Sequence, residues 1–224
     1  MTTMSDRLAQ YRSAVLEDVA RYVADRTGAQ RQIVRDQVEA VSEGVVAAPL
    51  SLAMADALGA PPGGRRGAGL ATALVELAAL SLRRFCSDGE GQGQDAGQPL
   101  ALNAADGLYA LAHLAQLDLA APAQGGPVET LPRLDALAAQ VWEGAMASGP
   151  FGEWGGVAGR LGRFAGSAAA VGAGRTALLD ALTELGESLT LKWSGGAMRP
   201  ESAGVVNRAP FTEDERVKLL ALSG

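Results

Sequence analysis

Apolar residues recur every three or four positions along most of the chain, which is the spacing of a helix face. Two stretches show the pattern most clearly, LATALVELAALSLRRF (70–85) and LALNAADGLYALAHLAQL (100–117). Their apolar positions are Leu70, Leu74, Leu77, Ala78 and Leu82 in the first, and Leu102, Ala105, Leu108, Ala112 and Ala115 in the second. The segment between them, CSDGEGQGQDAGQP, is too rich in Gly, Gln and Asp to continue either helix. The pattern predicts two long helices joined by a polar loop, an arrangement that can frame a ligand cavity.

Weaker versions of the same pattern predict further helices on both sides of this pair. They cover Ser5–Arg26, Gln30–Ser42, Gly44–Gly59, Arg133–Ser148, Arg163–Gly174, Thr176–Trp193 and Phe211–Leu222. Proline and glycine predict connectors over Pro61–Gly67, Pro122–Pro132 and Ser194–Arg208. Gly149–Gly162 is predicted to be a bend, or a helix whose glycines permit a close backbone approach. We therefore expect an all-α protein, a single-domain helical bundle over residues 1–224.

Composition agrees with this class and excludes several others. The chain has 224 residues, 48% of them hydrophobic and only 4% aromatic, with a net charge of −6. The acidic balance and the lack of a basic cluster argue against nucleic-acid binding. The single cysteine, Cys86, excludes an internal disulfide framework and fits a reducing compartment. Charges throughout MTTMSDRLAQYRSAVLEDVA argue against a signal peptide, and no apolar run reaches the roughly 18 residues of a membrane span. We expect a cytoplasmic protein without a transmembrane segment.

The order of segments carries a family resemblance. Leu102–Ala112 contains NAADGLYALA, which matches a helix written LAGDALLALA almost position for position, with Asp106 in place of its aspartate. Gly159–Gly174 and Leu182–Trp193 stand where that family has GKTAALFAAAxxLGA and the helix running into FQxxDD. The chain thus resembles the trans-polyprenyl diphosphate synthases from residue 5 to residue 208. The resemblance implies a helical bundle of the isoprenoid synthase type.

The segments that carry the family's chemistry are degenerate. Members of the family ionise an allylic diphosphate with Mg²⁺ held by two aspartate-rich motifs, because Mg²⁺ prefers hard oxygen ligands. Here the first motif is replaced by Cys86-Ser87-Asp88-Gly89-Glu90, and the second by Trp193–Met198, which has no carboxylate. The diphosphate-binding GGKRxRP segment is replaced by Gly44–Pro49. By resemblance, the chain has lost the family's metal site, so we assign no catalytic residue and expect no cofactor.

Five residues remain as site candidates, each with a structural alternative. Asp88 and Glu90 can retain one weak metal ion, or belong to a solvated loop. Asp106 can line a cavity, or accept hydrogen bonds at a helix contact. Arg83 and Arg84 can meet a substrate diphosphate, or form surface ion pairs.

Aromatic and histidine residues have simpler interpretations. His113 has no obvious carboxylate partner in the sequence and is interpreted as a helix-face histidine. Trp142, Trp154 and Trp193 are predicted to anchor the core or an interface.

Three hypotheses follow. The first is a non-catalytic subunit that docks on an active prenyl diphosphate synthase, with a homodimer or a hetero-oligomer as its assembly. The second is a divergent prenyltransferase or terpene synthase with a reduced Mg²⁺ site built from Asp88, Glu90 and Asp106. The third is a helical protein that binds an isoprenoid without chemistry. Copurification of a catalytic chain, Mg²⁺-dependent diphosphate release and bound lipid distinguish them.

Overall fold

The computed structural model describes residues 3–28, 31–88, 97–121, 127–148, 154–195 and 202–223. Its elements, in chain order, are α1 (Met4–Arg26), α2 (Arg31–Val41), η2 (Ser42–Gly44), α3 (Ala47–Ala57), α4 (Pro62–Asp88), α5 (Gly97–Ala120), α6 (Pro127–Ser148), α7 (Trp154–Gly172), η3 (Thr176–Leu178), α8 (Leu179–Trp193), α9 (Ser202–Arg208) and α10 (Glu213–Ala221). The described residues form helices and turns and contain no strand, which confirms the predicted all-α class.

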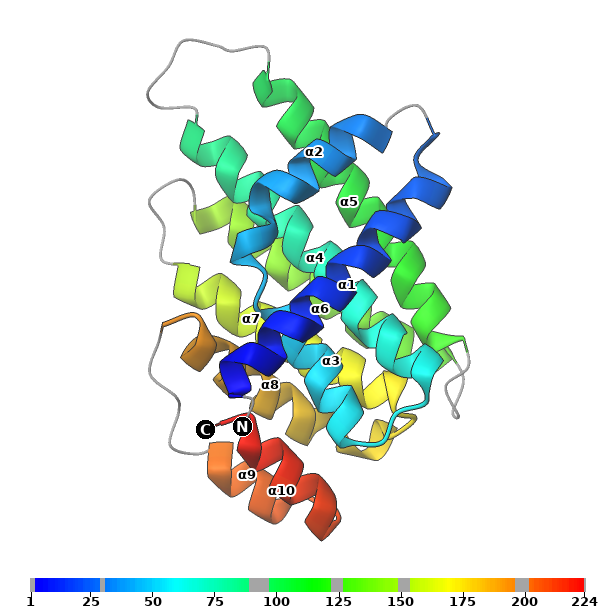
Figure 1. The fold of residues 1–224 in the computed structure, drawn as a ribbon, viewed down its shortest axis with the longest axis vertical. Helices are drawn as coiled ribbons and strands as arrows, with labels where there is room; N and C mark the ends of the chain where they lie inside the picture. Colours follow the sequence, from blue (N-terminus) through cyan, green and yellow to red (C-terminus); the bar gives the residue numbers. More distant parts are fainter. Residues whose placement is uncertain are drawn as a thin grey trace.

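The long helix α4 is the centre of the bundle. It packs against α1, α3, α5, α6 and α7, while α8 packs mainly against α7. Figure 1 shows α1 crossing one face of the bundle diagonally, with α9 and α10 at one end next to both chain ends. Leucine and alanine fill the helix contacts, and Leu77 of α4 and Leu108 of α5 are completely buried. Each large apolar side chain buried in this way contributes about 1.5–3 kcal/mol.

Two helices begin with capping boxes, in which side chains satisfy the backbone N–H groups of the first turn. Thr3 caps α1 together with Asp6, and Ser5, the first residue of the predicted range, lies inside the helix. Thr212 caps α10 together with Glu215.

The start of α4 departs from the prediction. The helix begins at Pro62, inside the predicted connector Pro61–Gly67. Proline suits the first helical position because the N–H that it lacks has no partner there. Gly64 then packs directly on α7, since a Cβ on it would lie 1.9 Å from the carbonyl oxygen of Gly172. Glycine at this position permits close contact between α4 and α7, and it does not end the helix.

Three other predicted connectors or bends are also helical. α6 begins at Pro127 and continues through Pro132, and α7 begins at Trp154, so the described part of Gly149–Gly162 takes the helical alternative of the two predicted for it. The short helix α9 lies in the predicted tail. Tertiary packing outweighs local propensity in these segments.

None of the described helices is by itself long and apolar enough to cross a membrane. The segments Gln32–Gly44 and Ala47–Ala57 are together long and apolar enough for a membrane span, but the chain bends by 74° between them. In α3 every residue except Asp56 is buried within the bundle.

Candidate functional site

A carboxylate of the chain itself binds the backbone of the segment 44–49, where the resemblance places a diphosphate-binding motif. Glu76 of α4 reaches the start of α3 and is 2% exposed. Its Oε1 accepts from the backbone N–H groups of Val46 at 2.8 Å and Ala47 at 2.9 Å, and its Oε2 accepts from Ala48 at 2.9 Å. Burial raises the pKa of the Glu76 carboxyl, while these three donors and the positive charge of Arg12 oppose the rise. The helix start that could attract an external anion is thus already satisfied.

The interior beside this carboxylate is filled by side chains. Leu50 and Met54 of α3, Leu74 of α4 and Phe164 of α7 each have 0% of their surface exposed. A side chain that bordered a void would present surface to a water-sized sphere, so no such void adjoins these four. α3, α4 and α7 therefore meet in close packing at these four side chains.

A buried hydroxyl group and several glycines hold the helices in contact. The Ser51 hydroxyl donates to the carbonyl oxygen of Ala165 at 3.0 Å, which links α3 to α7. Between α7 and α8, a Cβ on Gly166 would lie 1.8 Å from the carbonyl oxygen of Leu182. Glycine lets these backbones touch, which leaves no room for a ligand between them. The small residues of the predicted helix Arg163–Gly174 serve the tight contacts expected of them.

The arginine candidates lie at the far end of α4. Arg83 stacks its guanidinium over the ring of Trp154, 4.7 Å from the centroid. Arg84 donates to the carbonyl oxygen of Ala40 at 3.4 Å and is exposed. Both make additional interactions, so protein contacts already engage them. Their proposed role toward a diphosphate remains a prediction.

The acidic candidates do not form a described metal site. Asp88 is the last residue of α4, but its side chain lies outside the described part of the structure, and so does the whole of Glu90. Among the residues that the structure describes, no three His, Cys, Asp or Glu side chains are close enough to hold a metal ion. The described donor set therefore does not fit Mg²⁺.

Asp106 lies on the outer face of α5. Its side chain is exposed, and its role toward a ligand remains a prediction. The same face continues through Ala110, Leu114, Leu117 and Ala121, all of them exposed. Leu114 and Leu117 are each 46% exposed. We refer to these four apolar residues as the α5 seam.

His113 joins α5 to α6 through a partner that the sequence analysis missed. Its Nδ1 lies 2.9 Å from Oδ1 of Asp135. The ring of Tyr109 meets His113 edge-on, with centroids 4.6 Å apart, and stacks on Trp142 at 4.7 Å. Burial, followed by the charges of Asp135 and Glu143, raises the pKa of the Tyr109 phenol. Trp142, like Trp154 and Trp193, is partly buried against the core, as predicted.

The end of α8, where the second aspartate-rich motif would stand, is tied to the C-terminal segment. Lys192 donates through Nζ to the carbonyl oxygen of Ser223, and the indole N–H of Trp193 donates to that of Leu222 at 3.1 Å. A Cβ on Gly159 of α7 would lie 3.8 Å from Leu191, which is close to this end of α8, and Arg83, near the end of α4, stacks on Trp154, the first residue of α7. The two segments that resemble the motif-bearing helix ends therefore both lie near the first turns of α7.

Comparison with solved structures identifies the fold. The geranylgeranyl pyrophosphate synthetase from the archaeon Geoglobus acetivorans superposes with a TM-score of 0.64 over 98% of this chain and 86% of its own, at 18% sequence identity. The chain therefore has the isoprenoid synthase fold, as the resemblance implied. No protein-family profile matches the chain. No curated protein matches its sequence. At this identity the likeness establishes the fold alone.

Proposed function

We propose that the chain is a non-catalytic helical subunit that associates in the cytoplasm with a catalytic prenyl diphosphate synthase. The observation that carries this proposal is the packed interior. Leu50, Met54, Leu74 and Phe164 fill the space between α3, α4 and α7. A bundle filled in this way cannot hold an isoprenoid chain there, but it is a rigid scaffold for binding another protein.

The α5 seam supplies the surface for that partner. Ala110, Leu114, Leu117 and Ala121 are separated by four, three and four residues, which is the spacing of an apolar seam between paired helices. Both leucines are close to half exposed, and a partner helix would remove this apolar surface from water. We assign this surface to a helix of the catalytic chain.

The two alternatives receive less support from the described residues. A reduced Mg²⁺ site would need Asp106 to approach Asp88 and Glu90, but Asp106 shares the outer face of α5 with the seam. An isoprenoid-binding protein would need an apolar cavity, and the packed residues of α3, α4 and α7 leave none beside them. Both alternatives are tested by the same experiment.

The test combines an activity assay with sedimentation. The purified chain, a catalytic prenyl diphosphate synthase from the same source and their mixture are each given Mg²⁺, isopentenyl diphosphate and an allylic diphosphate. We expect no product from the chain alone. In the mixture we expect a stable complex and a changed rate or product length. Product formation by the chain alone would overturn the proposal, and so would a mixture that neither associates nor changes in activity.

A matched pair of variants locates the interface. Leu117→Glu places a charge in the α5 seam and should abolish both the complex and its effect on activity. Val217→Glu is the control, because Val217 is 59% exposed on α10, away from the seam. Equal behaviour of the two variants would exclude the α5 seam as the docking surface.

A further inference from the structure

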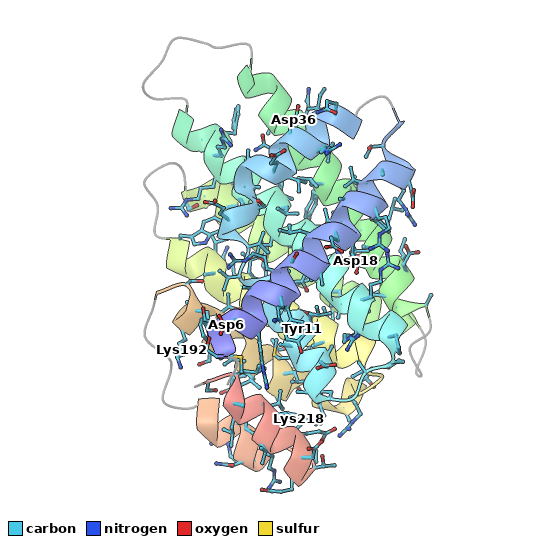
Figure 2. All side chains as sticks on the ribbon, in the orientation of Figure 1. Asp6, Tyr11, Asp18, Asp36, Lys192 and Lys218 are labelled. Carbon is cyan, nitrogen blue, oxygen red and sulfur yellow. The ribbon has the colours of Figure 1, made fainter. Side chains whose placement is uncertain are left out.

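A surface cleft lies between α1, the first turn of α4 and the last turns of α5. Its volume is about 340 Å³, within the range of small-molecule sites. It lies at the start of α4, whereas Arg83 lies near the end, and 17 residues of helix between Arg66 and Arg83 span about 25 Å. The cleft is therefore separate from the positions that resemble the substrate-binding segments of the family. Figure 2 labels Asp18 of α1, which forms ion pairs with Arg21 and Arg66 of the lining.

Three guanidinium groups line the cleft, from Arg21, Arg26 and Arg66. Each is oriented by an aspartate through one nitrogen atom. Arg66 Nε lies 3.0 Å and Arg21 Nη2 lies 3.3 Å from Oδ1 of Asp18, and Arg26 Nη2 lies 3.3 Å from Oδ2 of Asp118. A guanidinium has five N–H donors, so further donors of each group remain for an oxyanion. The arginine side chain of each pair is more than a third exposed, so a ligand can compete for it.

The aromatic and apolar side chains of the cleft complement these charges. The Tyr22 hydroxyl donates to Asp118 at 3.1 Å, and the Arg26 guanidinium stacks 3.7 Å from the centre of the Tyr22 ring. Burial, followed by the charge of Asp118, raises the pKa of Tyr22 to about 12, so the phenol keeps its proton. Asp118 is thus partly neutralised by two partners, which leaves Asp25 as the other carboxylate of the lining. Leu70 contributes apolar surface.

The start of α4 adds a second source of positive potential. The first turn of a helix presents backbone N–H groups without helical partners. Pro61 precedes the helix and has no side chain that could cap them, and Gly63 lines the cleft. A Cβ built on Gly63 has no atom within 4 Å, so this part of the cleft is open. A helix start of this kind favours an anion.

We propose that this cleft binds a small ligand that carries a phosphate or diphosphate group. The guanidinium groups of Arg21, Arg26 and Arg66 and the first turn of α4 hold the oxyanion, because guanidinium forks match phosphate oxygens. Leu70 and the Tyr22 ring contact the remainder of the ligand. Either inorganic phosphate and pyrophosphate or an organic phosphate ester has the required chemistry.

The test is isothermal titration calorimetry of the full chain at low ionic strength. Three probes are used, which are inorganic phosphate, inorganic pyrophosphate and n-pentyl phosphate. We expect saturable binding of at least one, weakened as salt is raised. Tighter binding of pyrophosphate identifies an inorganic ligand, and tighter binding of pentyl phosphate identifies an ester. Binding of none of the three would overturn the proposal.

Substitutions at Gly63 separate ligand binding from folding. Gly63→Asp puts a carboxylate into the open space at the helix start, where it suits the helix dipole, so the variant should fold at least as well as the parent. It should weaken probe binding at least tenfold, whereas Gly63→Ala should retain it. Arg26→Gln should weaken binding several-fold, and Arg208→Gln, on α9, should not change it. Unchanged binding by a folded Gly63→Asp variant would refute the site.

This inference is independent of the proposed partner. The measurements use the isolated chain, and the residues substituted in the cleft belong to α1 and α4, whereas the seam belongs to α5. Failure of probe binding therefore leaves the proposed association with a synthase unaffected, and failure of that association leaves the cleft unaffected.

Discussion

Replacing Glu76 by glutamine tests the contact between α4 and the start of α3. The carboxylate accepts three backbone N–H groups through its two oxygens. In Glu76→Gln one oxygen can still accept from Val46 and Ala47, but the amide NH₂ then faces the N–H of Ala48. Two donors meet in a site where the glutamate is 2% exposed, and no water replaces the lost acceptor.

The expected cost follows from the hydrogen bond that is lost. A hydrogen bond to a charged group contributes about 1.5–3 kcal/mol, and a buried donor left without a partner costs about 1–3 kcal/mol. We expect Glu76→Gln to lower the free energy of unfolding by about 2 kcal/mol at pH 7. For a chain of this length, each kcal/mol corresponds to about 2–4 °C in Tm.

The pH dependence has a defined sign. Burial raises the folded-state pKa of Glu76 above its ordinary value of 4.5, so the folded state binds a proton more tightly than the unfolded state. The stability that this proton contributes is fully present below pH 4.5 and is lost as the pH rises through the folded-state pKa. The glutamine variant lacks this titration. The advantage of the wild type over Glu76→Gln should therefore shrink as the pH rises above 4.5.

Urea unfolding followed by circular dichroism between pH 4 and pH 8 measures both effects. Glu143→Gln is the matched control, because Glu143 is exposed on α6, and it should change stability by less than about 0.5 kcal/mol. If Glu76→Gln is as stable as Glu143→Gln, or if its deficit grows with pH, the reasoning is refuted.

Four further variants test other contacts by thermal or urea unfolding. Gly166→Ala should lower the free energy of unfolding by at least about 3 kcal/mol, because its Cβ would lie 1.8 Å from a carbonyl oxygen of α8. Gly155→Ala, whose Cβ would enter open space, should raise the free energy of unfolding by about 0.5–1 kcal/mol. Similar values for the two variants would contradict the close approach of α7 to α8. Gln116→Met should raise stability by about 1–2 kcal/mol, since both polar side-chain atoms of Gln116 are buried without partners; destabilisation would contradict this. Burial alone would raise the pKa of Glu215, but the backbone N–H of Thr212 and the guanidinium of Arg175 outweigh burial and lower that pKa. Glu215→Gln should therefore destabilise the fold at pH 7. This deficit should disappear as the pH falls through the folded-state pKa, and a deficit that persists would refute it.

Local patterns in the sequence were sufficient for the class of structure and for most helices. The spacing of Leu70, Leu74 and Leu77 predicts α4, and the order of such segments predicts the isoprenoid synthase fold that the comparison shows. This succeeds because a helix face is set by residues three and four apart. The same reasoning failed at Pro62 and Pro127, where local breakers stand at helix starts that packing stabilises.

The site residues depended on tertiary structure. In the sequence, Glu76 is a single acidic residue within an apolar helix. Its role as the cap of α3 appears only in the folded bundle, which places it beside backbone N–H groups about 30 positions earlier in the chain. Arg26 and Arg66 read as solvated charges until α1 and α4 bring them into one cleft. The sequence by itself determined most of the helices, because the apolar face of a helix depends on near neighbours. Only the packing of the helices decided which polar groups meet, because hydrogen bonds and ion pairs form between residues that are distant along the chain.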